Sequence, residues 1–206
     1  MPPLMPVSAF LFDIGKVIID FDFGRTVAAV AERCSAGPVE GLLESVTDLT
    51  VQLELGNLST DDFLTKVCER IGFSGETEEF RLAFEDVFDL NTPMVDFIQE
   101  RYQAGIPLYL LSNTNGIHVP YFTAKYAVFS RFSGAIYSHE AKCMKPDAGI
   151  YEQAIEKLEL VPEETVYIDD LDANCKAGRG FGLQTICYDL HQHNAFLERV
   201  SALQIN

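Results

Sequence analysis

The sequence predicts an α/β fold in which helices flank a parallel sheet and a helical segment is inserted after the first strand. After residue 90, apolar runs of strand length alternate with helix-length patterns, which is typical of a parallel sheet. Between residues 21 and 91 only helical patterns occur, and no run has the character of a buried strand. We therefore expect a core formed by residues 1–20 and 92–206, interrupted by a helical domain of residues 21–91.

The first predicted strand is an apolar run that starts at Val7 and ends at Asp13. Open α/β sheets bind their ligands at the carboxyl ends of their strands, and an ionised carboxylate seldom lies there for packing alone. Gly15, two residues later, leaves this carboxylate uncovered. Asp13 is therefore the leading candidate for a functional residue, and the structural alternative is that it caps a turn.

The predicted insert contains a clear amphipathic helix and most of the negative charge. The helix begins near Ser59, places Phe63, Val67 and Ile71 on one face, and ends at Gly72. Residues 21–91 carry fifteen acidic and five basic residues, a net charge of −10 out of −16 for the whole protein. This excess is typical of a solvated acidic surface. It disfavours a polyanionic substrate and favours a small one.

The next helix and strand lead to a polar cluster. Thr92 as N-cap, Pro93 in the first turn and Gly105 after the last turn frame a helix. The strand 106–111 follows, and the polar residues 112–115 come directly after it. Hydroxyl and amide groups at this position either cap the next helix or bind a ligand.

A short strand at Ile136 and Tyr137 precedes Lys145, which lies just before a helix with Asp147 as its expected N-cap. Taken alone, Lys145 has the character of an ordinary solvated lysine. Its significance depends on its position after a strand of the predicted sheet.

The strand 165–168 ends in Asp169 and Asp170, and a short helix is expected over 172–179. Adjacent carboxylates at the end of a buried strand repel each other, so such a pair usually indicates a bound cation. Mg²⁺ prefers carboxylates, waters and phosphate oxygens as ligands. A carboxylate, a hydroxyl, a lysine and a carboxylate pair at successive strand ends are the components of a phosphoryl-transfer site.

Composition excludes several classes of function. With 48% hydrophobic residues the chain can bury a sizeable core, while its negative charge disfavours binding to nucleic acid or to membrane surfaces. No run approaches a membrane span, and the start of the sequence lacks a basic segment leading into an apolar one, so we expect a cytoplasmic protein. Five cysteines without CxxC spacing are expected to be reduced thiols.

Four segments together resemble the motifs of the haloacid dehalogenase superfamily. They are FLFDIGKV at 10–17, LLSNTN at 110–115, KPDAGIY at 145–151 and VYIDDLDAN at 166–174. The resemblance covers essentially the whole chain, and it is strongest to bacterial phosphatases of glucose 1-phosphate and related sugar phosphates. It implies a Rossmann-like core with a helical cap, and Mg²⁺-dependent hydrolysis of a small phosphorylated metabolite, such as a sugar 1-phosphate.

The resemblance also implies residue roles. Asp13 would be the nucleophile that forms an aspartyl-phosphate. Mg²⁺ would be held by Asp13, the carbonyl of Gly15 and Asp170, with Asp169 acting directly or through water. Asn174 would support the metal-binding loop.

Further implied roles concern the phosphoryl group. Ser112 and the Asn113 amide would bind its oxygens, and Lys145 would neutralise its charge. Lys16, where the family commonly has glycine, could assist phosphate binding or crowd the metal. Arg25, just inside the insert, is a candidate substrate contact.

One departure from the family pattern is Gly15, where most of these phosphatases have an aspartate that protonates the leaving oxygen. Three interpretations follow: a substrate with an acidic leaving group such as a sugar 1-phosphate, an acid from the insert with Asp20 and Asp22 nearest in sequence, or a weakly active or non-catalytic binding module. A 2-haloacid dehalogenase also lacks that acid but needs no Mg²⁺. The pair of Asp169 and Asp170 favours the phosphatase. Oligomeric state is not predicted by the sequence.

Overall fold

The core of the protein is a five-stranded parallel sheet with the strand order β5-β4-β1-β6-β7. The structure is a computed structural model that describes residues 7–35 and 41–203. Three segments lie outside the described residues: 1–6 and 204–206 of the expected core, and 36–40 of the expected insert. The first of them holds most of the N-terminal stretch for which the sequence predicts no leader. The strands are β1 (Ala9–Phe12), β4 (Leu108–Ser112), β5 (Gly134–Tyr137), β6 (Thr165–Asp169) and β7 (Gln184–Cys187). The predicted α/β class is confirmed.

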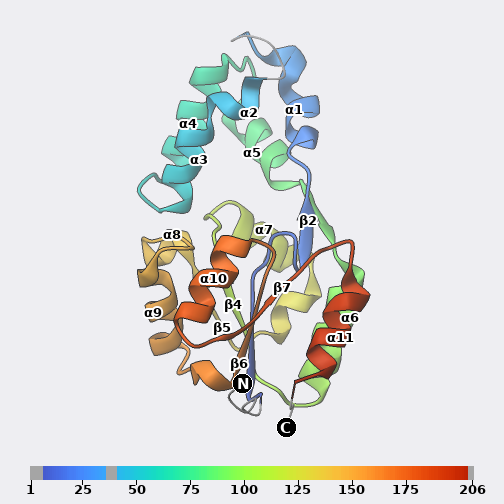
Figure 1. Ribbon diagram of the computed structural model, residues 1–206. Helices are drawn as coiled ribbons and strands as arrows, with labels where there is room; N and C mark the ends of the chain where they lie inside the picture. The colour runs from blue at the N-terminus through green and yellow to red at the C-terminus, as the bar shows by residue number, and fades with distance from the viewer. Residues whose placement is uncertain (1–6, 36–40, 204–206) are drawn as a thin grey trace.

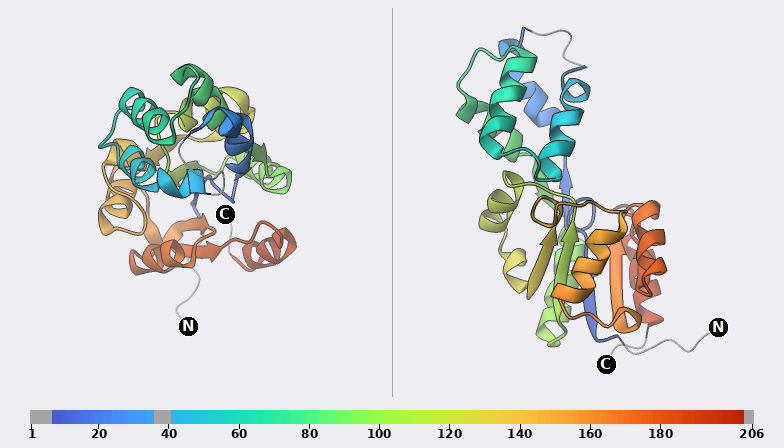
Figure 2. Two further views of the ribbon diagram at one scale, coloured as in Figure 1. Left: turned by 90° about the horizontal axis from the view of Figure 1, so that it is seen from above. Right: turned by 90° about the vertical axis from the view of Figure 1, so that its left-hand side faces the viewer.

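Helices cover both faces of the sheet (Figure 2). Alternating side chains of the buried strands pack against these two helical layers. Phe10 and Phe12 of β1 pack with one layer, where the rings of Phe10 and Phe97 meet edge to face at 5.6 Å between centroids. Leu11 packs with the other layer. The first layer contains α6 (Thr92–Gln103), α7 (His118–Lys125) and α11 (His193–Ser201), and the second contains α9 (Ala148–Lys157) and α10 (Asp172–Gly180).

The described helices between β2 (Ile19–Phe21) and β3 (Phe88–Leu90) form a separate group beyond one end of the sheet (Figure 1). They are α1 (Gly24–Val30), α2 (Leu42–Ser45), α3 (Thr47–Glu54), α4 (Thr60–Ile71) and α5 (Thr77–Glu85), with a 3₁₀ turn at Ala31–Arg33. Phe63, Phe80 and Phe84 are central to their own apolar cluster. Because β1 leads through β2 into α1 and all five strands of the sheet are parallel, the carboxyl ends of the strands face this group.

Two short strands connect the helical group to the core. β2 (Ile19–Phe21) and β3 (Phe88–Leu90) are antiparallel, with Ile19 opposite Leu90 and Phe21 opposite Phe88. The expectation that residues 21–91 contain only helices is therefore wrong at their edges. Strands of three residues are too short to show a period-2 pattern, so they could not be predicted from the sequence.

Several helix boundaries agree with expectation. The Ser59 hydroxyl accepts a hydrogen bond from the Asp62 amide at the start of α4, and Gly72 ends that helix with φ of 60°. Asp147 is the N-cap residue of α9, although its side chain accepts no capping hydrogen bond. The expected helix 172–179 is observed as α10.

The N-cap of α6 is Asn91, and the expected N-cap Thr92 is the first helical residue. The Asn91 side-chain amide donates to the carbonyl of Val17 at 2.6 Å and to the hydroxyl of Tyr188 at 2.8 Å. Asn91 therefore joins the start of α6 to two distant parts of the core, which sequence spacing could not indicate.

The remaining elements are α8 (Ser138–Ala141) and the 3₁₀ turns Ala127–Arg131 and Pro162–Glu164. The sequence did not predict these elements, nor α7, β7 and α11. All five cysteines have free thiols. Within the part of the chain that the structure describes, no helix combines the length and apolarity needed to cross a membrane.

Candidate active site

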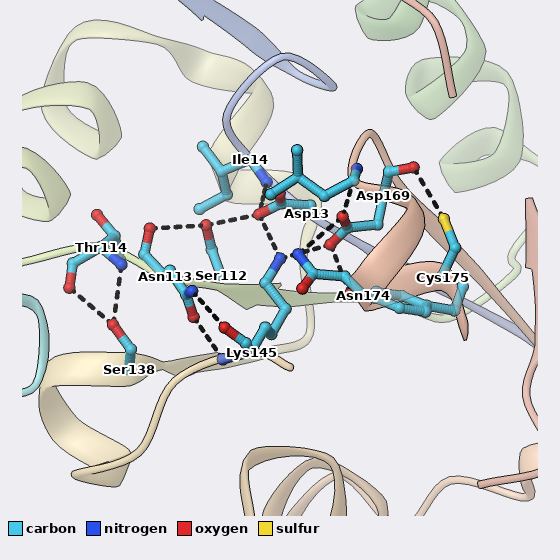
Figure 3. Close-up of polar contacts among 12 residues, drawn as sticks. Asp13, Ile14, Ser112, Asn113, Thr114, Ser138, Lys145, Asp169, Asn174 and Cys175 are labelled. Atoms are coloured by element: carbon cyan, nitrogen blue, oxygen red, sulfur yellow. Dashed lines mark hydrogen bonds and ion pairs between the residues drawn. The ribbon is translucent and has the colours of Figure 1, made fainter. Parts of the chain in front are cut away.

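Asp13 lies at the carboxyl end of β1 and is held through one oxygen of its carboxylate (Figure 3). Its Oδ1 accepts hydrogen bonds of 2.7 Å from the Ile14 amide and from the Ser112 hydroxyl, and it lies 2.9 Å from Nζ of Lys145. Among residues 7–35 and 41–203, no donor to Oδ2 is found. The carboxylate is thus fixed in orientation while its second oxygen stays available.

Lys145 joins two buried carboxylates. Its Nζ lies 2.9 Å from Asp13 and 2.6 Å from Asp169, and only 1% of its side chain is exposed. Burial alone lowers the pKa of Lys145, but the two carboxylates outweigh it and the net shift is upward. Lys145 therefore remains a cation at neutral pH.

Asp169 is fully buried and both of its oxygens are occupied. Oδ2 accepts from Lys145 and from the Tyr167 hydroxyl at 2.5 Å, and Oδ1 accepts from the Leu171 amide at 2.9 Å and from the Asn174 side chain at 3.0 Å. The role of Tyr167 could not be predicted from the sequence, because an apolar strand gives no sign of where one hydroxyl points. With four donors around it, Asp169 orients Lys145 and has little capacity left for a direct metal contact.

Asp170 differs from Asp169 in being half-buried. Burial, with the nearby charges of Asp13 and Asp169, raises its pKa to about 6. Asp13, Asp169 and Asp170 each place one oxygen within 4.8 Å of the others. Three carboxylates with one lysine between them form a hard, anionic donor set, and this set fits a divalent cation such as Mg²⁺.

The end of β4 connects the Asp13 site to the loop that carries Lys145. The Ser112 hydroxyl donates to Asp13. The Asn113 side chain makes two hydrogen bonds with the backbone of Lys145: its Nδ2 donates to the carbonyl at 3.0 Å, and its Oδ1 accepts from the amide at 2.8 Å. Phosphate binding by Ser112 and Asn113 stays a prediction, but the structure brings both residues to Asp13 and Lys145.

Other candidate residues lie elsewhere. Lys16 pairs with Asp20, so both charges are engaged beside the hollow that Asp170 also lines. Arg25 pairs with Asp89 of β3 at the exposed junction. The Asp22 carboxylate accepts a hydrogen bond from the backbone amide of Gly24. None of these four predicted residues, Lys16, Asp20, Asp22 and Arg25, lines the cavity described next.

A cavity of about 110 Å³ extends from the end of β4 toward the helical group. Its lining mixes apolar and aromatic side chains with polar ones, which come from the end of β4, from α7 and from α3. The lining residues are Ile14, Gly15, Ile19, Phe21, Phe23, Glu54, Phe88, Ser112, Asn113, Thr114, His118 and Phe122. Both the core and the helical group therefore contribute to it.

Glu54, the last residue of α3, is the carboxylic acid among the described lining residues. Burial, with a smaller contribution from the negative charge of Asp13, raises its pKa to about 7. Glu54 could not be identified from the sequence, because its position over the site depends on how the helical group docks on the core.

His118 links the two parts of the protein at the same cavity. Its Nδ1 lies 3.0 Å from Nδ2 of Asn115, which can only donate, so Nδ1 is an acceptor and Nε2 carries the proton given to the Phe84 carbonyl. The rings of Phe84 and Phe88 pack on it at 4.5 and 4.9 Å. Burial lowers the pKa of His118 to about 4, so this histidine is neutral at pH 7.

Acidification is expected to weaken the docking that His118 provides. The unfolded chain binds this proton at an ordinary pKa of 6.5, whereas the folded protein binds it only near 4. The stability that neutral His118 contributes is therefore present above pH 6.5 and is lost as pH falls toward 4. The free energy of unfolding should fall by about 2 kcal/mol between about pH 7.5 and about pH 5. Urea unfolding should show this loss, and His118→Gln should be less stable at pH 7.5 but flatter in its pH dependence. Equal slopes for the two proteins would contradict the assignment.

The sequence matches the family described as haloacid dehalogenase-like hydrolase over residues 7–182. It is 28% identical over 190 residues to a D-ribitol-5-phosphate phosphatase of Bacteroides thetaiotaomicron, covering 87% of this chain and 90% of that protein. It is 22% identical over 179 residues to a sesquiterpene phosphatase of Aspergillus oryzae, covering 85% and 87%.

Among solved structures, a haloacid dehalogenase family enzyme of Bacteroides thetaiotaomicron superposes with a TM-score of 0.84 at 24% identity, covering 95% of this chain and 100% of that one. The same enzyme in complex with magnesium and inorganic phosphate gives a TM-score of 0.81 at 24% identity, covering 93% and 98%. These similarities establish the fold of the core and helical group together.

Proposed function

This chain belongs to the haloacid dehalogenase-like hydrolase family, and we propose that it is a Mg²⁺-dependent phosphatase of small phosphomonoesters. The observation that carries the proposal is the cluster of Asp13, Asp169 and Asp170, whose oxygens lie within 4.8 Å of one another beside Lys145 and Ser112. Such a cluster suits a cation and the phosphoryl group that it accompanies. The phosphatase names of the two relatives agree with this reaction class.

The metal would be held by Asp13, Asp170 and the carbonyl of Gly15, with Asp169 acting through water because its oxygens already have four donors. When bound, Mg²⁺ neutralises charge on the phosphoryl oxygens and so reduces their repulsion from the nucleophile.

The reaction follows from the orientation of Asp13. Its Oδ1 is fixed by Ile14, Ser112 and Lys145, so Oδ2 is the oxygen that attacks phosphorus to form the aspartyl-phosphate. Lys145 balances the negative charge that accumulates, and the Asn113 amide holds phosphoryl oxygens, joined by Ser112 when its hydroxyl turns from Asp13 to the bound phosphoryl group. Water then releases phosphate from Asp13.

The cavity size and the sequence relatives together favour a sugar phosphate or polyol phosphate as the substrate. A volume of about 110 Å³ suits a small leaving group and disfavours a polymer. Sugar 1-phosphates have a comparatively acidic leaving oxygen, which suits a site with glycine at position 15. The relative that acts on D-ribitol 5-phosphate points instead to a primary ester.

A substrate panel tests the proposal. The protein is incubated with sugar 1-phosphates, D-ribitol 5-phosphate, nucleotides and 2-haloacids, each with Mg²⁺ and with EDTA. Phosphate release that requires Mg²⁺ supports the phosphatase. Halide release in EDTA identifies a dehalogenase, and silence across the panel favours a non-catalytic binding module.

The metal assignment predicts unequal effects of two substitutions. Asp170→Asn removes a ligand, so it should raise the Mg²⁺ concentration needed for half-maximal activity by about 10- to 100-fold. Ser112→Ala should lower the rate but change the Mg²⁺ requirement little. The same titration followed by thermal melting should show a Mg²⁺-dependent rise in Tm for wild type and Ser112→Ala that Asp170→Asn lacks. Equal Mg²⁺ requirements in the two variants would refute the assignment.

A further inference from the structure

The reaction on a phosphate ester needs a proton for its leaving oxygen, and position 15 cannot supply one. Gly15 has no side chain, and a Cβ added there would lie 3.0 Å from Cε1 of Phe21, closer than a normal carbon contact. The Phe21 ring thus occupies the space into which a side chain at position 15 would extend. The proton donor must come from another residue.

The cavity lining leaves one suitable donor. Ser112 already donates to Asp13, and both ring nitrogens of His118 are engaged, Nδ1 with Asn115 and Nε2 with the Phe84 carbonyl. In the part of the chain that the structure describes, the Glu54 carboxyl has neither a hydrogen bond nor an ion pair. Glu54 therefore reaches the cavity with a carboxyl group that no protein contact uses.

The end of α3 is anchored to the core close to Glu54. Gly56 has φ of 64°, and a Cβ added there would lie 2.1 Å from the His139 carbonyl oxygen, so the backbone approaches α8 as closely as glycine allows. The Lys142 ammonium donates to the Gly56 carbonyl. These contacts fix Glu54 two residues away, over the same cavity that Gly15 and Ser112 line.

We propose that Glu54 is the general acid and base of this enzyme, supplied by the helical insert in place of a residue at position 15. The inference rests on the proposed phosphatase function. As the Asp13 oxygen bonds to phosphorus, the ester P–O bond breaks, and its electron pair on the leaving oxygen takes the proton of Glu54. The alcohol departs and Glu54 is left as a carboxylate.

The second half of the cycle restores the starting state. Glu54 takes a proton from water as the water oxygen bonds to phosphorus, and the bond between phosphorus and Asp13 breaks with its electron pair returning to the Asp13 carboxylate. Phosphate leaves and Glu54 is protonated again. A carboxyl group with a pKa of about 7 can hold the proton in one step and accept it in the next at neutral pH.

This role widens the expected substrate class. With an acid over the cavity, the enzyme is not confined to sugar 1-phosphates, whose leaving oxygen needs less help. Primary alkyl phosphates, of which D-ribitol 5-phosphate is one, become equally suitable substrates.

Glu54→Gln tests the inference with two esters that differ in their need for a proton. D-Ribitol 5-phosphate must release an alcohol, whereas acetyl phosphate releases acetate, which is stable as an anion. The kcat/KM of the variant should fall by about 10²- to 10⁴-fold for D-ribitol 5-phosphate and by less than about tenfold for acetyl phosphate. Because kcat/KM reports the steps up to departure of the leaving group, slow hydrolysis of the aspartyl-phosphate does not obscure this difference.

Glu69→Gln is the matched control, since it makes the same change on the exposed surface of α4. Glu69→Gln should leave kcat/KM unchanged for both esters. Mg²⁺ should raise the Tm of Glu54→Gln and of Glu69→Gln as it does for wild type. Equal losses on the two esters, or no loss on D-ribitol 5-phosphate, would overturn the role of Glu54 while leaving the phosphatase intact. Wild-type protein that releases phosphate from no ester of the substrate panel and not from acetyl phosphate would overturn the proposed function, and the role of Glu54 with it.

Discussion

Asp13→Asn is expected to lower kcat for phosphate release by at least about 10⁴-fold, because the substituted amide cannot form the aspartyl-phosphate. The substitution is close to isosteric, and Asn can still accept the hydrogen bonds of Ile14 and Ser112 through its oxygen. Lys145 keeps its contact of 2.6 Å with Asp169. Phosphate release with saturating Mg²⁺ measures the effect, and thermal melting should show a folded protein.

Asp20→Asn is the control for this prediction. Asp20 lies in β2, pairs with Lys16 and does not line the cavity, so its loss should change kcat by less than about threefold. A variant at Asp13 that keeps more than a tenth of wild-type kcat would show that another residue is the nucleophile.

Lys145→Met is expected to cause the largest loss of stability, about 3–5 kcal/mol in the free energy of unfolding, because it leaves two buried carboxylates without their cation. The Lys145 side chain is 1% exposed and lies within 3 Å of Asp13 and Asp169, so solvent does not compensate for its loss. Urea unfolding near pH 7 measures the change. Activity should be lost as well, because Lys145 neutralises charge on the transferring phosphoryl group.

A second substitution separates charge from packing. In the double variant Lys145→Met with Asp169→Asn, one unpaired carboxylate is removed, so part of the lost stability should return. Lys176→Met, an exposed lysine on α10, should change stability by less than about 0.5 kcal/mol. If the double variant were less stable than Lys145→Met by the full cost of Asp169→Asn, the charge explanation would be wrong.

Much of the core could be predicted because its signals are local. Apolar runs that end in polar residues located β1, β4 and β6 and their functional ends at Asp13, Ser112 and Asp169. Parallel strands bring such ends to one edge of a sheet, so the proximity of these residues followed from strand order alone. Short or exposed elements such as β2, β3 and β7 lacked this pattern and were missed.

The sequence could not show which of the two adjacent aspartates, Asp169 or Asp170, would contact the metal directly. Asp169 and Asp170 differ by one position, and only the folded backbone shows that Asp169 points into a set of four donors. Asp170 remains half-buried, and among the described residues no comparable set of donors surrounds its carboxylate, which is why we assign it the direct metal contact.

By itself, the sequence determined the α/β class, the helical insert, the family motifs and the absence of an acid at Gly15, because each of these features depends on residues that are adjacent in the chain. The tertiary structure decided which distant group compensates for that absence. Asp20 and Asp22 were nearest in sequence, yet their side chains are engaged at the junction, and Glu54 reaches the cavity from the far end of α3. A residue that acts across two docked units is placed by long-range packing, and no spacing within the chain encodes that contact.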